Sequence, residues 1–81
     1  MKKISTFHSP SICYEIIEED SFFHIKTYLK NSEDPHNPNH VSLIKNFSKS
    51  LETAELFTKA VSSAAALPIH MEELAEAFLS D

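Results

Sequence analysis

The sequence contains no glycine, no arginine and no tryptophan, and it has one cysteine among 81 residues. Without glycine there is neither a Gly-rich loop that holds nucleotide phosphates nor a dinucleotide-binding fingerprint. The usual nucleophile elbow of α/β-hydrolases also needs glycine. These absences exclude most familiar nucleotide enzymes. Because the chain has no other recognisable catalytic constellation, we expect a protein that is not an enzyme and needs no cofactor.

The absence of arginine bears on partners. Arginine is the residue best suited to bidentate contacts with phosphates and base edges. Seven lysines face twelve acidic residues, giving a formal net charge of −5. Residues 1–49 carry six lysines and six acids, whereas residues 50–81 carry one lysine and six acids, so the second segment holds all of the excess. We therefore expect binding neither to nucleic acid nor to an anionic membrane surface.

The single cysteine, Cys13, allows no intramolecular disulfide, so the chain is not a disulfide-stapled secreted scaffold. Its basic start lacks the apolar segment of a signal peptide, and no apolar run approaches the roughly 18 residues of a membrane span. The sequence predicts a cytoplasmic protein with a single domain, residues 1–81. A domain of this size is marginally stable, and self-association would help it.

The first part of the chain predicts β-structure. Residues 12–17 are rich in β-branched and aromatic side chains, and residues 22–30 alternate between apolar and polar. The acids Glu18, Glu19 and Asp20 lie between them, in a predicted solvent-exposed loop of about four residues built around a type I turn. After a loop rich in Asn and Pro, residues 41–47 predict a third strand, with Val41, Leu43 and Phe47 on one face. Residues 1–11 form either a weak edge strand or a flexible arm.

The second part predicts two amphipathic helices. Ser48 or Ser50 can cap the first helix, residues 50–65, which ends before Pro68. The second helix covers residues 71–79. The fold class is therefore α+β, with an antiparallel sheet of three or four strands followed by two C-terminal helices packed on one face. The predicted core consists of Leu51, Phe57, Val61, Leu74, Phe78 and Leu79 with Ile16, Ile25 and Leu43.

The entry to the second helix has a predicted capping arrangement. With His70 as the N-cap, Glu73 is the N3 residue that reaches back to the His70 amide. Ile69, which follows Pro68, would pack against Leu74 as a hydrophobic staple. The alternative is that His70 is a functional histidine.

The same segment carries a resemblance. Leu67-Pro68-Ile69-His70-Met71, followed by Ala75-Glu76-Ala77-Phe78-Leu79, resembles a family of small bacterial proteins of unknown function. In that family a Pro-Ile/Val-His-Leu segment leads into a short helix ending in Glu-Asp-Phe-Leu. The chain differs in having Met71 for Leu and Ala77 for Asp. The resemblance implies strands followed by helices, and it implies no activity, because none is assigned to the family.

Two groups of residues invite chemical hypotheses. His36 and His40 lie near Asp34, but Pro35 and Pro38 forbid a helix there, and a metal ion would need a further ligand such as His24 or Cys13. We favour a polar loop without metal. Cys13 lies in the middle of a strand, whereas reactive thiols favour helix N-termini and electropositive pockets, so we favour a structural role for it.

We therefore expect a non-enzymatic protein–protein interaction module, either monomeric or a homo-oligomer. Helix residues left exposed after packing would mark the interface, and the candidates are Leu74, Phe78, Leu79 and Phe57. The alternative is an acidic regulatory or inhibitory protein that competes for a basic surface. A third, less favoured hypothesis is a histidine-dependent metal or ligand binder that uses His36, His40 or His70.

Overall fold

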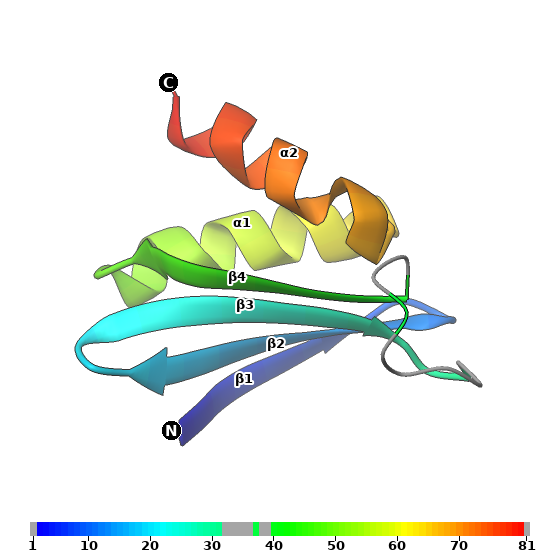
Figure 1. The fold of residues 1–81 in the computed structure, drawn as a ribbon, viewed down its shortest axis with the longest axis horizontal. Helices are drawn as coiled ribbons and strands as arrows, with labels where there is room; N and C mark the ends of the chain where they lie inside the picture. The colour runs from blue at the N-terminus through cyan, green and yellow to red at the C-terminus, as the bar shows by residue number, and fades with distance from the viewer. Residues whose placement is uncertain (1, 32–36, 38–39, 81) are drawn as a thin grey trace.

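The computed structural model describes residues 2–31, 37 and 40–80. Four strands are followed by two helices, as the α+β prediction requires (Figure 1). The strands are β1 (Lys2–His8), β2 (Ile12–Glu19), β3 (Phe22–Leu29) and β4 (Val41–Ser48), and the helices are α1 (Leu51–Ser63) and α2 (Pro68–Leu79). The strands form one antiparallel sheet in the order β1-β2-β3-β4. β1 is the edge strand that was one of the two alternatives for residues 1–11.

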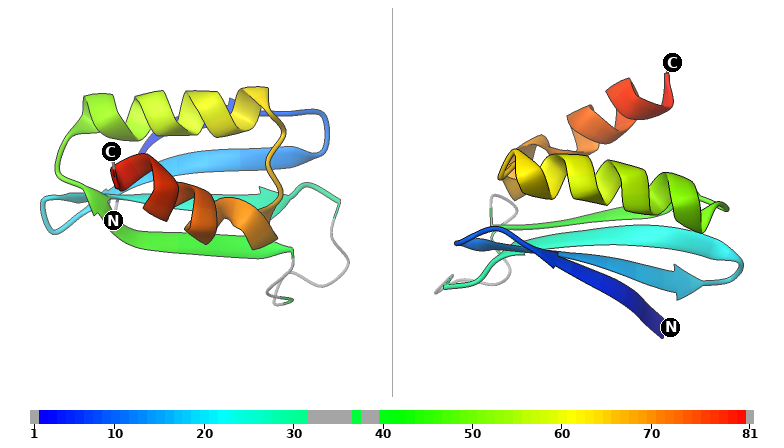
Figure 2. Two further views of the ribbon diagram at one scale, coloured as in Figure 1. Left: turned by 90° about the horizontal axis from the view of Figure 1, so that it is seen from above. Right: turned by 180° about the vertical axis from the view of Figure 1, so that it is seen from behind.

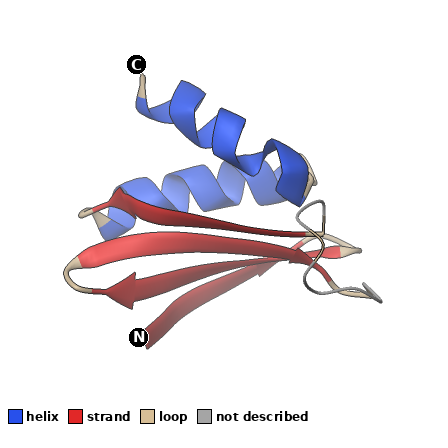
Figure 3. Ribbon diagram, viewed as in Figure 1, coloured by secondary structure: helices blue, strands red, loops and turns tan. Residues whose placement is uncertain are grey.

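Both helices lie on the same face of the sheet (Figures 2 and 3). α1 packs mainly on β2, and α2 packs mainly on β4. Among the described residues, no helix or strand covers the opposite face. We call this uncovered side the open face and the helix side the covered face.

The β2–β3 hairpin closes through two residues, not through the predicted loop of about four residues. Glu19 pairs with Phe22, so only Asp20 and Ser21 lie between the strands, with φ angles of 54° and 69°. Positive φ at both positions is typical of a type I′ turn, whose twist matches that of paired strands. The prediction was wrong because this turn does not strictly need glycine, since Asp tolerates the left-handed conformation.

Strand β4 does not alternate as predicted. The pairing register shifts between Ile44 and Ser48, and Asn46 has a left-handed φ of 54°. A bulge of this kind bends the strand and ends the simple alternation of faces. Phe47 consequently enters the core with 4% exposure, whereas Leu43 lies on the open face with 49% exposure. The predicted common face for Leu43 and Phe47 was therefore wrong.

Aromatic rings join the two helices to the sheet. Phe57 of α1 lies 4.7 Å from Phe47 and 5.3 Å from Phe78 of α2, measured between ring centroids. Offset and tilted aromatic pairs at these distances add to the stabilisation from burial. The predicted core is confirmed for Ile16, Ile25, Phe57 and Val61, with Leu51 and Phe78 packed against it. It is wrong for Leu43, Leu74 and Leu79, which are exposed.

The two helices begin differently. Ser50 caps α1 as predicted, because its side chain accepts a hydrogen bond from the Thr53 amide at 3.3 Å. α2 begins three residues earlier than predicted: Leu67 is its N-cap, without a side-chain hydrogen bond, and Pro68 is its first residue. The fixed φ of proline suits the first helical position. The prediction that His70 is the N-cap was therefore wrong, because His70 lies inside the first turn.

Candidate functional site

The strand register determines which side chains share the open face. Successive residues of a strand point to opposite faces, and directly paired residues share a face. Tyr14 and Ile16 of β2 are core residues on the covered face, so the residues between and beside them face the other way. The central part of the open face is formed by Cys13, Glu15, Ile17, His24, Lys26, Tyr28, Val41 and Leu43.

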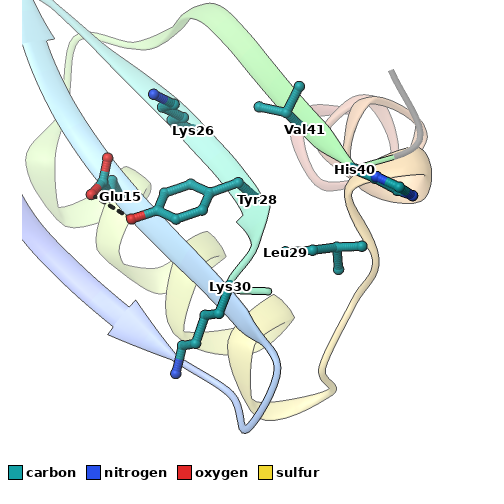
Figure 4. Close-up of a pocket in the computed structure, with 7 residues that line it drawn as sticks. All are labelled: Glu15, Lys26, Tyr28, Leu29, Lys30, His40 and Val41. Carbon is teal, nitrogen blue, oxygen red and sulfur yellow. Dashed lines mark hydrogen bonds between the residues drawn. The ribbon is translucent and has the colours of Figure 1, made fainter. Parts of the chain in front are cut away.

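A buried carboxylate lies at the centre of this face. Glu15 is 7% exposed. Its Oε2 atom is 3.1 Å from the Lys3 ammonium and accepts a hydrogen bond of 3.2 Å from the Tyr28 hydroxyl. Buried charges persist when they are paired and hydrogen-bonded, as here. Figure 4 shows Tyr28 lying across the sheet toward Glu15. These two partners satisfy the Oε2 atom of the buried carboxylate.

Tyr28 remains protonated at physiological pH. A hydrogen bond with the Cys13 side chain, burial and the neighbouring Glu15 carboxylate all raise the pKa of Tyr28 above its ordinary value of 10. Its hydroxyl therefore acts as a hydrogen-bond donor to Glu15 and not as a base or nucleophile. Cys13 itself is 3% exposed, which agrees with a structural role.

A shallow hollow of about 370 Å³ opens beside Tyr28. The Lys26 ammonium lies 5.6 Å from the centroid of the Tyr28 ring, a cation–π contact. The Lys30 ammonium donates to the Ser9 carbonyl at 2.8 Å. Two lysines and the Glu15 carboxylate thus meet in this hollow, and Leu29 and Val41 form its apolar part (Figure 4). Its lining residues are Glu15, Lys26, Tyr28, Leu29, Lys30, His40 and Val41.

A second hollow, of about 360 Å³, lies toward the hairpin end of the open face. His24 lines it, and both ring nitrogens of His24 face backbone groups. Nδ1 accepts a hydrogen bond of 2.8 Å from the Asn46 amide, and Nε2 lies 3.3 Å from the Glu19 carbonyl. His24 therefore holds the β4 bulge against the hairpin. Its lining residues are Ile17, Glu19, Asp20, His24, Leu43, Lys45 and Asn46.

The predicted interface residues do not form one surface. Leu74 and Leu79 of α2 are 39% and 51% exposed. Phe78 is half-buried against the aromatic rings. Phe57 is 2% exposed, so it belongs to the core and not to a surface. At the start of α2, Pro68 is buried, whereas Ile69, His70 and Glu73 are exposed.

Part of the metal hypothesis lies outside the described residues, which include neither Asp34 nor His36. His40 is half-buried, and its backbone accepts a hydrogen bond from the Leu29 amide at 3.0 Å. Within the described residues, no three His, Cys, Asp or Glu side chains gather as a potential metal site.

The sequence prediction missed the open face because residues 12–17 resemble one continuous buried run. The signal that reveals this face is the position of the turn. Once Asp20 and Ser21 are assigned to the turn, Glu15 falls opposite Lys26 and Cys13 falls opposite Tyr28. With Glu15 opposite Lys26, one face of the β2–β3 pair carries polar side chains, and this is the open face.

No protein-family model, curated protein or solved structure matches this chain. The resemblance of its C-terminal segment to a family of small bacterial proteins therefore stays a prediction. In the part of the chain that the structure describes, neither helix is long and apolar enough to span a membrane.

Proposed function

We propose that the chain is a non-enzymatic protein–protein interaction module that docks its partner on the open face of the sheet. Leu43 carries this proposal: it is 49% exposed on a sheet face that no described element covers. Its cross-strand partner is Lys26, and Lys45 follows two residues later. Ile17 lines the same hollow as Leu43, and Val41 lines the neighbouring hollow, so the apolar surface extends beyond one side chain. An apolar surface with a polar rim is typical of a site that a protein partner covers.

Binding fits this face better than catalysis does. Glu15 is paired with Lys3 and Tyr28, Tyr28 is kept protonated, and the nitrogens of His24 face backbone groups. A general base or nucleophile needs a free group with a suitable pKa. Each of these three side chains is engaged in holding the sheet together.

Site-specific photo-crosslinking in cells tests the docking surface. A photoreactive amino acid replaces Leu43 in one variant and Leu56 in the control. Leu56 is 58% exposed on α1, so the two positions are similarly accessible. We expect a covalent adduct of defined mass from position 43 and none from position 56.

Adducts from position 56 alone would contradict the open face as the docking surface. No adduct from either position, together with a monomer free of bound protein in native mass spectrometry, would contradict the interaction function itself.

The second candidate is the acidic regulator. The charges of the helical layer favour it, because residues 51–80 carry five glutamates and only Lys59. All five glutamates are exposed. In this case Glu72→Lys with Glu76→Lys abolishes binding, Leu43→Asp leaves it intact, and affinity falls steeply with salt.

A further inference from the structure

We propose that the partner on the open face is a second copy of this chain, which docks there with the outer side of its helix α2. The inference rests on the proposed function, because it names the occupant of the same surface. Two observations lead to it: the lysines of the open face, and the acidic, aliphatic outer side of α2.

The outer side of α2 combines carboxylates with aliphatic side chains. Residues spaced three or four apart share one side of a helix. Met71 and Ala75 point into the core and are buried. The opposite and flanking positions are exposed. α2 contains neither lysine nor arginine. The exposed positions include Ile69, Glu72, Glu73, Glu76 and Leu79, and also His70, Leu74 and Ala77.

This side of α2 is accessible to another molecule. Figure 1 shows α2 as the outermost element on the helical side, with its C-terminal half rising away from the sheet. Ile69 and Leu79, near the two ends of α2, are 54% and 51% exposed. The chain itself therefore leaves both aliphatic residues without full cover.

The open face carries the complementary groups. Glu15 neutralises Lys3, but Lys26 and Lys30 remain beside the first hollow, and Lys45 lies beside the second. Leu43 and Val41 provide the aliphatic contact next to these lysines. Besides Glu15, which is paired with Lys3, the acids that line the two hollows are Glu19 and Asp20, and both lie at the hairpin end.

The dimensions of the two surfaces are compatible. Twelve helical residues extend about 18 Å, since each adds about 1.5 Å. Strands of eight residues extend about 26 Å, at about 3.3 Å per residue. One helix α2 therefore fits within the length of β3 and β4.

The charges also select the symmetry of the contact. Two copies joined through their α2 helices would place glutamates against glutamates, and like charges at an interface are repulsive. Joining unlike surfaces places the α2 glutamates near Lys26, Lys30 and Lys45. Such a head-to-tail contact leaves one free docking surface at each end, so it continues into a ring or an open chain.

Sedimentation velocity of the full chain tests this, at concentrations up to about 1 mM, where weak contacts are populated. The sheet variant is Leu43→Asp with Lys45→Glu, and Asp at position 43 lies opposite Lys26. The helix variant is Glu72→Lys with Glu76→Lys. The control is Glu52→Lys with Glu55→Lys on α1, which makes the same charge change on exposed residues elsewhere. Circular dichroism verifies that each variant is folded.

We expect the wild type and the control to associate more strongly as concentration rises and salt falls, and each of the two interface variants alone to be monomeric. An equimolar mixture of the sheet and helix variants forms dimers and nothing larger, because each contributes one intact surface. A monomeric wild type at about 1 mM overturns the inference, and so do two variants that fail to complement each other. If the wild type is monomeric but position 43 crosslinks to a different protein, the proposed function stands and self-association fails.

Discussion

The two faces of the sheet reach similar burial of β2 by different means. On the covered face, Tyr14 and Ile16 are fully buried beneath helices. On the open face, Cys13, Glu15 and Ile17 are 3%, 7% and 9% exposed although no described element covers them. Long neighbouring side chains provide that cover, because lysine and tyrosine spread their apolar parts over the surface and keep their polar ends in water.

The comparison separates two kinds of stability. The covered face gains free energy from apolar packing between the sheet and the helices. A partner on the open face does not touch this packing. The open face is held by a paired carboxylate and cross-strand contacts, and these groups are close enough to the surface to meet a partner. We therefore expect large stability effects on the covered face, and smaller stability effects with large binding effects on the open face.

The largest expected effect is on the covered face. Phe57→Ala removes the ring that contacts both Phe47 and Phe78. Loss of a buried phenylalanine lowers the free energy of unfolding by about 3–5 kcal/mol. Urea denaturation measures it, with Leu43→Ala as the open-face control, for which we expect a change within about 0.5 kcal/mol. Equal losses from both substitutions would contradict the difference between the faces.

The next effect concerns the buried carboxylate. Glu15→Ala removes the acceptor of the Tyr28 hydroxyl and the partner of Lys3. Lys3 is 59% exposed and regains water, so the loss comes mainly from the unpaired hydroxyl and the small cavity, about 1–3 kcal/mol. Thermal denaturation compares it with Lys3→Ala, which we expect to cost at most about 1 kcal/mol, as is typical of an exposed ion-pair member. If Lys3→Ala cost more than Glu15→Ala, the carboxylate would not be the centre of the open face.

Tyr28→Phe should have a smaller effect that depends on pH. At pH 8 the lost hydrogen bond costs about 1 kcal/mol. The raised pKa of Tyr28 means that the folded protein keeps this proton above pH 10 while the unfolded chain releases it. The contribution of Tyr28 is therefore fully present below pH 10 and is lost as the pH rises beyond it. The free-energy difference between wild type and variant should shrink between pH 8 and pH 11 in urea denaturation.

The control for this pH dependence is Tyr14, which is present in both proteins and whose pKa is raised by burial. Its effect cancels in the difference between wild type and Tyr28→Phe. A difference that stays constant from pH 8 to pH 11 would contradict the raised pKa of Tyr28.

The sequence predicted the fold well where the spacing of apolar residues determines the structure. The alternation of Phe23, Ile25 and Thr27 placed β3 correctly, with its buried side toward the helices. The predictions failed where residues with positive φ change the strand pairing that the apolar spacing would give. The left-handed Asn46 changes which face of β4 is buried, and the type I′ turn sets the pairing that creates the open face. Neither is marked by glycine, which is the usual sequence signal for positive φ.

The helix faces show a second limit. Periodicity assigned Leu74 and Leu79 to the core with Phe78, because all three lie within a wide apolar sector of the helix. Only the angle at which α2 leaves the sheet decides which of them is covered (Figure 1). That angle depends on tertiary packing with β4 and α1 and not on the local sequence.

The smallest expected effect lies in the connection between the helices, away from both sheet faces. Ala65 follows the C-cap of α1 with a left-handed φ of 53°, the position at which helices commonly carry glycine. Replacing it by glycine removes the clash of the β-carbon but makes the unfolded chain more flexible, so the net gain is about 0.5–1 kcal/mol. Ala60→Gly, inside α1, is the matched control and should cost about 1 kcal/mol. Since neither substitution alters the open face or the outer side of α2, Ala65→Gly should raise the melting temperature while self-association stays unchanged. A lowered melting temperature would contradict the left-handed conformation of Ala65, and weakened association of the stabilised variant would mean that stability and docking are coupled through the helical layer.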